Sequence, residues 1–257
     1  MEESGRGVGS QWQAGSEGGS GLAGSNRVLG AEIVTLDEQL ALMRRDWDQR
    51  ARENARHFVD TSRTQWSDET FFASGERSIA QDVLTDMTNI CQGRDPASMR
   101  VLEIGCGAGR LTRALSNIFG EIHAVDVSGE MVTQARAALV DRPNVTFYQN
   151  NGCDLAVVPA LVFDFAYSSH VFQHIPSREA IESYVGEVYR LLRPGALFKF
   201  QVQGDWTEYS TPDDTWHGVS FTSEQATDMA QRYGFDLRYS FGADQQYFTL
   251  WFFKPEA

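Results

Sequence analysis

The sequence predicts an α/β fold with a doubly wound sheet of about seven strands. The chain has 257 residues and is 42% hydrophobic, enough for one sizeable core. From residue 100 onward, short apolar runs typical of strands alternate with segments whose apolar residues recur every three or four positions, as in helices. Residues 235–241 and 247–253 form a closing pair, so we also expect a C-terminal antiparallel strand.

Each expected element has its own sequence signal. The expected strands are residues 100–104, 121–125, 145–149, 163–167, 196–202, 235–241 and 247–253. Helices are expected at residues 111–118, after Ser128, at 177–192 and at 222–233. Before the first strand, a helix at 36–58 opens with a capping box of Thr35 and Glu38, and a second is expected at 75–90. These two helices predict an N-terminal helical lid.

Composition limits the partners and the compartment. The net charge of −13 and pI near 4.8 disfavour a phosphate backbone, so we expect no nucleic-acid partner. Cys91, Cys106 and Cys153 have no metal-type spacing and are expected to be reduced thiols. No apolar stretch approaches the ~20 residues needed to span a bilayer, and no secretory signal is evident. We therefore expect a cytoplasmic protein with no membrane partner. The sequence sets no oligomeric state.

The most informative motif follows the first strand. Glu103 is followed by glycines at 105, 107 and 109, which allow backbone N–H groups to approach a ligand closely. A dinucleotide fingerprint would need Gly or Ala at position 110, which is Arg110 here. The Glu103 carboxylate would also repel a pyrophosphate. A cationic ligand with an amino group suits this loop better.

With these features, residues 99–200 resemble the class I (Rossmann-like, seven-stranded) S-adenosylmethionine-dependent methyltransferases, close to their small-molecule-modifying branch. The Phe163-Asp164-Phe165 segment and residues 191–196 match later motifs of that family. The resemblance implies S-adenosyl-L-methionine as the cofactor. Three regions are therefore expected: a disordered tail (1–30), from its Gly/Ser-rich composition, a helical lid (31–95), from its two helices, and the cofactor-binding methyltransferase domain (96–257), from the resemblance.

The same resemblance implies roles for individual residues. The glycine loop would hold the methionyl part of the cofactor, and Asp126 the two ribose hydroxyls. Val127 and Met131 would flank the adenine. Asn151 and Gly152 replace the family's usual adenine-binding aspartate. The full set of candidate cofactor-binding residues is Glu103, Gly105, Cys106, Gly107, Asp126, Val127, Met131, Asn151, Gly152 and Ser168.

His170 and His174 are the candidate catalytic residues. They follow the fourth strand, where ligands of open α/β sheets bind, and histidine titrates near neutral pH. His174 can instead be a structural residue that hydrogen-bonds the local turn. Candidate substrate-pocket residues, each also explicable as packing, lie in three regions: the lid (Trp47, Phe71, Phe72 and Gly75), residues 204–218, and residues 247–251.

The absence of three known motifs narrows the range of possible methyl acceptors. After the fourth strand the chain lacks the tetrad of nucleic-acid amino-methyltransferases, the two-glutamate loop of protein-arginine enzymes and the carboxylate cluster of metal-dependent catechol enzymes. We therefore expect methyl transfer to the O or N of a small molecule without a metal. Two alternatives stay open: a protein methyltransferase acting on a basic peptide, and a non-catalytic cofactor-binding partner subunit.

Overall fold

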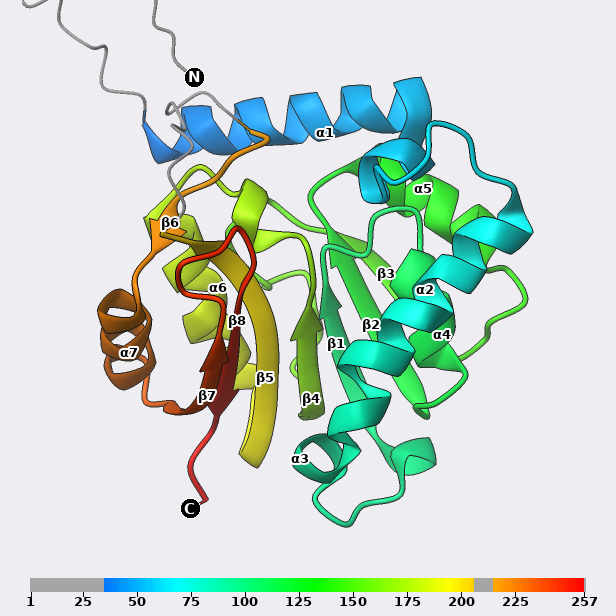
Figure 1. The fold of residues 1–257 in the computed structure, drawn as a ribbon. Coiled ribbons are helices and arrows are strands. Elements are labelled where there is room, and N and C mark those ends of the chain that lie inside the picture. The colour runs from blue at the N-terminus through cyan, green and yellow to red at the C-terminus, as the bar shows by residue number, and fades with distance from the viewer. Residues whose placement is uncertain (1–34, 206–214, 257) are drawn as a thin grey trace, which may run out of the picture. The chain divides into compact units, whose positions relative to one another are not determined.

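The computed structural model describes residues 35–205 and 215–256. In this part of the chain the strands form one mixed sheet of eight strands in the order β3-β2-β1-β4-β5-β8-β7, with β6 paired to the end of β5 (Figure 1). Only β8 runs antiparallel to its neighbours β5 and β7. The strands are β1 (Arg100–Ile104), β2 (Glu121–Asp126), β3 (Val145–Gln149), β4 (Phe163–Ser168), β5 (Leu192–Gly204), β6 (Ser220–Phe221), β7 (Asp236–Phe241) and β8 (Phe248–Phe253). The predicted α/β sheet with a C-terminal antiparallel strand is confirmed.

Seven α-helices accompany the sheet in the described residues: α1 (Leu36–Val59), α2 (Asp68–Asp82), α3 (Met87–Cys91), α4 (Arg110–Ser116), α5 (Gly129–Ala138), α6 (Arg178–Leu191) and α7 (Ser223–Arg232). Most start where the sequence predicts. Thr35 and Glu38 form the expected capping box of α1, and Ser128 caps α5 by accepting a bond from the Met131 N–H at 3.1 Å.

The strands bury alternate residues on two faces, which gives two hydrophobic cores. Val101 packs in the core beneath α2, α4 and α5, whereas its neighbours Leu102 and Ile104 pack in the core beneath α6 and α7. All three side chains are at most 2% exposed. The predicted double winding therefore leaves the strand ends as the sheet's accessible edge.

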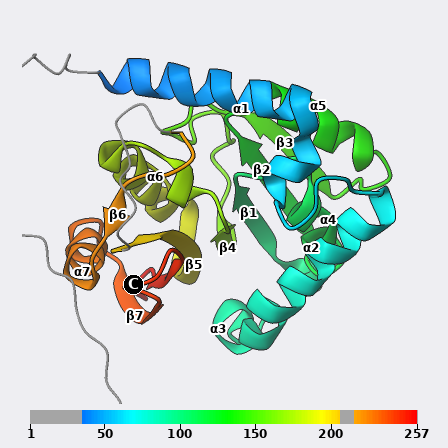
Figure 2. The same cartoon turned by 45° about the horizontal axis from the view of Figure 1, so that its top comes forward.

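Helix α1 lies across the carboxyl edge of this sheet (Figures 1 and 2). Leu40 and Met43, near its start, pack in the core on the α6 side, while Ala51 and Ala55 pack in the core on the α2 side. Asn54 has non-helical φ/ψ angles and kinks the helix, and its side chain accepts from the His57 N–H at 3.3 Å. The last turn of α1 is thereby turned toward the strand ends.

The second predicted helix was misplaced. It was expected to begin at residue 75, but α2 begins at Asp68 and buries the rings of Phe71 and Phe72. Ser67 caps it through the Thr70 N–H at 3.2 Å, a signal that the polar composition obscured. Leu84, within the range expected to be helical, lies in a 3₁₀ segment and is 49% exposed.

A tertiary contact explains why α2 ends at Asp82 and does not continue to residue 90. Asp86 accepts hydrogen bonds from Lys199 on β5 at 3.0 Å and from the Trp251 indole on β8 at 2.6 Å. The chain turns through a short 3₁₀ segment (Leu84–Asp86) to reach these strands before α3 begins. Both partners lie more than a hundred residues away, so local periodicity could not predict this break.

Candidate functional site

A cavity of about 610 Å³ lies at the carboxyl ends of β1, β2 and β4. Here the chain passes from β1 to β2 and β3 on one side and returns to β4 on the other, which is the usual ligand site of open α/β sheets. The end of α1 with residues 60–62, the 169–175 segment, Trp216, Gln246 and Tyr247 complete the wall.

The glycine loop forms the floor of this cavity. Gly105 and Gly107 have φ angles of 78° and 51°, in the left-handed region that favours glycine. A Cβ on Gly105 would lie 2.2 Å from Val171, and one on Gly107 would lie 2.7 Å from Val59. Side chains on these residues would therefore collide with the cavity wall. Cys106, also predicted from the sequence, lines the cavity between them.

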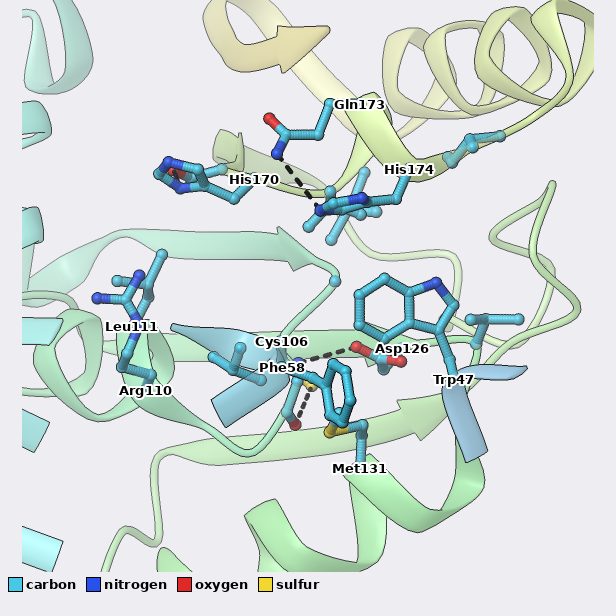
Figure 3. A pocket seen from close by; sticks show the side chains of 18 of the residues that line it. Trp47, Phe58, Cys106, Arg110, Leu111, Asp126, Met131, His170, Gln173 and His174 are labelled. Atoms are coloured by element: carbon cyan, nitrogen blue, oxygen red, sulfur yellow. Dashed lines mark hydrogen bonds between the residues drawn. The ribbon is translucent and has the colours of Figure 1, made fainter. Parts of the chain in front are cut away.

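Asp126 lies beside the loop at the end of β2, as Figure 3 shows. Its carboxylate accepts hydrogen bonds from the Gly107 N–H at 2.8 Å and the Ser128 N–H at 2.9 Å. Its enclosure by the protein raises its pKa to about 6. Val127 and Met131, the other residues predicted in this segment, also line the cavity. Asp126 retains carboxylate lone pairs for a ligand's hydroxyl groups.

Glu103 is the most strongly perturbed carboxylate of the site. It is 2% exposed, and its Oε2 has no hydrogen-bond partner within the described residues. Burial raises its pKa to about 7, and the charge of Asp126 adds to the shift. A ligand carrying positive charge and N–H donors would offset this cost. The ammonium and sulfonium groups of S-adenosylmethionine fit that requirement, and the open glycine floor leaves room for its chain.

Asn151 does not contact the cavity as predicted. Its side chain instead accepts from the Cys153 and Asp154 N–H groups at 3.0 and 2.9 Å, which closes a local turn, and Gly152 packs behind Met43. The neighbouring Asn150 lines the cavity, is 6% exposed and leaves its Oδ1 without a partner in the described residues. Asn150, one residue before the predicted Asn151, is thus the residue of this pair that offers the cavity a hydrogen-bond acceptor.

Ser168, predicted to bind the cofactor, likewise does not line the cavity. It is buried, and its hydroxyl donates to the Ile104 carbonyl at 2.9 Å, which ties β4 to β1. The cavity is lined by Ser169 instead. The alternation of side chains along a strand makes such one-residue errors natural, because adjacent residues point to opposite sides.

His170 faces the cavity from the corner after β4. Its φ of 58° is left-handed, which is uncommon for a residue with a Cβ. Although its ring is accessible from the cavity, surrounding protein lowers its pKa, and Arg110 adds to the effect. Its ring lies edge-on to Tyr247, with centroids 4.9 Å apart. The lowered pKa favours the neutral form of the His170 imidazole, which can accept a proton.

His174 has both ring nitrogens occupied. Nδ1 donates to the Trp216 carbonyl, and Nε2 lies 3.3 Å from the Gln173 amide nitrogen, from which it can accept (Figure 3). Burial lowers its pKa to about 4, and Arg50 adds to the shift. These contacts support the structural interpretation of His174, because a weak base with both nitrogens engaged is poorly suited to proton transfer.

An aromatic cluster forms another part of the cavity wall. Trp47 of α1 stacks on Trp216 with ring centroids 6.1 Å apart, and Phe58 meets the same indole edge-on. Thr215 fastens this segment to α1 through a 2.9 Å bond from its hydroxyl to Asp46. Of the predicted pocket residues, Trp47, Trp216 and Tyr247 line the cavity, whereas Phe71 and Phe72 belong to the core.

Two charged lining residues were not predicted. Arg110 is 6% exposed, and its Nη1 donates to Ser78 at 3.0 Å and lies 3.6 Å from the Asp60 carboxylate. In the sequence, Arg110 stood out only because a dinucleotide fingerprint would need Gly or Ala at this position. Asp60 lies 50 residues away in sequence, in the loop after α1. The ion pair joins the helical segment to the first turn of α4.

Two features are absent from the part of the chain that the structure describes, a metal-binding cluster and a membrane-spanning helix. Within residues 35–205 and 215–256, the His, Cys, Asp and Glu side chains form no group of three or more that could hold a metal ion. The helices of this part of the chain are all too short or too polar to cross a membrane.

Similarity to known proteins agrees with this geometry. Residues 102–200 match a methyltransferase-domain family model. The chain is 34% identical over 188 residues to a malonyl-[acyl-carrier protein] O-methyltransferase of Salmonella typhimurium, covering 70% of this chain and 67% of that one. It is 31% identical to a ubiquinone biosynthesis O-methyltransferase of Xanthomonas axonopodis, covering 39% and 41%.

A solved structure extends the likeness to the fold. The N-methyltransferase NodS of Bradyrhizobium japonicum, in complex with S-adenosylhomocysteine, superposes with a TM-score of 0.60 at 15% identity, covering 83% of this chain and 99% of that one. The fold is therefore Rossmann-like, as predicted. The family model and the relatives described above show that the chain belongs to the class I S-adenosylmethionine-dependent methyltransferases, in their small-molecule-modifying branch, and that its cofactor is S-adenosyl-L-methionine.

Proposed function

We propose that the protein transfers the methyl group to a hydroxyl oxygen of an uncharged small molecule, with His170 as general base. The observation that carries this proposal is the position of a neutral imidazole in the cavity wall, at the end of β4 and next to the glycine loop. Tyr247 and Trp216 give this end aromatic walls, which suit a planar acceptor such as a phenol.

The charges of the cavity favour an uncharged acceptor. Its described lining includes the carboxylates of Asp60, Glu103 and Asp126 and the guanidinium of Arg110. Arg110 is already engaged by Asp60. The two remaining carboxylates, Glu103 and Asp126, suit a cationic cofactor. An anionic acceptor would meet net negative charge in the same cavity. The relatives described above are named O-methyltransferases, which agrees with oxygen as the acceptor atom.

Each group has a defined task in this proposal. Bound S-adenosylmethionine supplies a methyl carbon activated by the positive charge of its sulfur. With the cofactor bound, its methyl group would be the group transferred and S-adenosylhomocysteine the leaving group, and His170 would take the proton of the acceptor hydroxyl. Asp126 holds the ribose, Glu103 and the loop from Gly105 to Gly107 hold the methionyl end, and Asn150 accepts from the adenine. Positioning and exclusion of water supply the remaining rate enhancement.

The surrounding elements fit this activity. We propose that the helical segment of residues 31–95 serves as a lid, since Trp47 and Phe58 close the cavity over the domain of residues 96–257. We also propose a cytoplasmic location, consistent with unpaired cysteines at 91, 106 and 153. The net charge of −13 supports an acceptor other than a nucleic acid.

The test follows a radiolabelled methyl group from the cofactor into separate pools of small molecules and proteins from one lysate. The expected label is in the small-molecule pool and survives alkali, because methyl ethers resist hydrolysis whereas methyl esters release methanol. His170→Ala is expected to lower the rate about 100-fold or more. His57→Ala serves as the matched control, since His57 lies outside the cavity wall.

Each other outcome contradicts the proposal in a different way. Alkali-labile label released as methanol would identify a carboxylate acceptor. Label in the protein pool would identify a protein methyltransferase. Cofactor binding without label in either pool would favour the non-catalytic partner. Full turnover by His170→Ala would remove His170 as the base.

A further inference from the structure

The side chain of Gln201, on β5, supports the corner that carries His170. Its Oε1 accepts a hydrogen bond from the His170 backbone N–H at 3.1 Å. This bond helps to hold His170 in its left-handed conformation, which is strained in a residue with a Cβ. A backbone N–H can only donate, so the bond also sets which way the Gln201 amide points.

The same oxygen determines where the hydroxyl proton of Ser169 lies. Ser169 Oγ is 3.4 Å from Gln201 Oε1, which can only accept, so the hydroxyl donates to it. Gln201 Oε1 thereby competes with the neighbouring imidazole for the single Ser169 proton.

This arrangement favours Nδ1 of the His170 ring as the hydrogen-bond donor to Ser169. Nδ1 lies 3.0 Å from Ser169 Oγ, whose proton is already directed elsewhere. Nδ1 must then be the donor and carry the ring's hydrogen. A neutral imidazole has one such hydrogen, so Nε2 keeps its lone pair. Contact with the edge of Tyr247 further limits rotation of the ring.

We infer that Gln201, acting through Ser169, is a positioning residue that fixes His170 in the Nδ1-protonated tautomer and leaves Nε2 as the proton acceptor. The use of that lone pair in catalysis rests on the proposed function, whereas the tautomer does not. Gln201 has a second anchor, because its Nε2 donates to Thr249 Oγ1 at 3.4 Å.

The tautomer can be measured without any acceptor. Long-range proton–nitrogen NMR correlations of protein labelled with ¹⁵N-histidine separate protonated from unprotonated ring nitrogens, and a His170→Asn variant assigns the signals. We expect wild-type His170 to carry its hydrogen on Nδ1. Gln201→Met and, independently, Ser169→Ala should lose this preference, while Gln201→Glu, which keeps the acceptor oxygen, should retain it.

A matched control separates this role from general support of the corner. Thr249→Val removes the bond on the other end of the Gln201 amide and should leave the tautomer unchanged. Wild-type His170 protonated on Nε2, or an unchanged tautomer in both Gln201→Met and Ser169→Ala, would overturn the inference. Because no acceptor is present, failure of the proposed hydroxyl chemistry cannot produce either result.

Kinetics supply the second readout. With the labelled small-molecule pool as acceptor, Gln201→Met should lower kcat at least tenfold with little change in the KM for the cofactor. In a His170→Ala background the same substitution should have no further effect, because Gln201 acts through that ring. Additive losses in the double variant would contradict a positioning role.

Discussion

Glu103 and Asp126 share one wall of the cavity, and their raised pKa values have a consequence for stability. The pKa of Glu103 is about 7 in the folded protein, against 4.5 for an exposed glutamate. Between these pH values the folded chain binds this proton and the unfolded chain does not. The contribution of Glu103 to stability therefore falls as the pH rises from about 4.5 to 7, and a cationic ligand reverses that loss.

Glu103→Gln should accordingly stabilise the folded protein while weakening its binding of the cationic cofactor. At pH 8 we expect its unfolding free energy to exceed the wild-type value by on the order of 2–3 kcal/mol, and the difference to vanish near pH 4.5. Urea unfolding at both pH values measures this. Glu130→Gln, at a partly exposed carboxylate outside the cavity wall, should show no such difference. Equal effects of Glu103→Gln at the two pH values would contradict the account.

At the residue scale, the sequence is most informative where backbone geometry dictates the residue type. The loop conformation requires the glycines at 105 and 107, the family resemblance pointed to the acid at 126, and the structure brings all three together at the cavity. Asn150 and Ser169 also line that cavity, each one position from the predicted Asn151 and Ser168. Which of two adjacent residues faces a cavity depends on where the strand ends, and the sequence leaves strand ends uncertain by a residue or more.

At the scale of elements, the packing of α2 on α4 places the first turn after the glycine loop. Gly75 allows this contact, because an added Cβ would lie 2.1 Å from the Arg110 carbonyl oxygen. The backbone cannot yield easily there, since Arg110 also pairs with Asp60. The sequence pointed to Gly75 as a pocket residue, but its role is close helix packing.

Gly75→Ala should therefore destabilise the fold by about 1–3 kcal/mol, even though alanine is the better helix former. Thermal unfolding measures the effect, and we expect the Tm to fall by roughly 2–10 °C. Glu76→Ala changes the next, exposed position of the same helix and should leave the Tm nearly unchanged. A Gly75→Ala variant as stable as the wild type would show that α2 can shift without cost.

Over the whole molecule, the doubly wound sheet was accessible from the sequence because alternating strands and helices admit few topologies. The sequence also pointed to Trp47 and to residues 204–218 as pocket residues, but not to how they meet. Trp47, Phe58 and Trp216 meet only through contacts between segments more than 150 residues apart, such as the bond from Thr215 to Asp46. Amphipathic periodicity predicts that α1 packs against something, and the tertiary fold decides that it crosses the strand ends.

The central claim is that Asp126 and the glycine loop bind the cofactor. Thermal unfolding with S-adenosylhomocysteine at about 100 times its Kd tests it most directly. The wild type should gain about 2.7 kcal/mol and roughly 5–10 °C in Tm. Asp126→Ala should lose about 10–100-fold in affinity, and with it about half or more of that gain at the same ligand concentration, whereas Glu130→Ala should keep it. An undiminished Tm gain in Asp126→Ala would contradict the account.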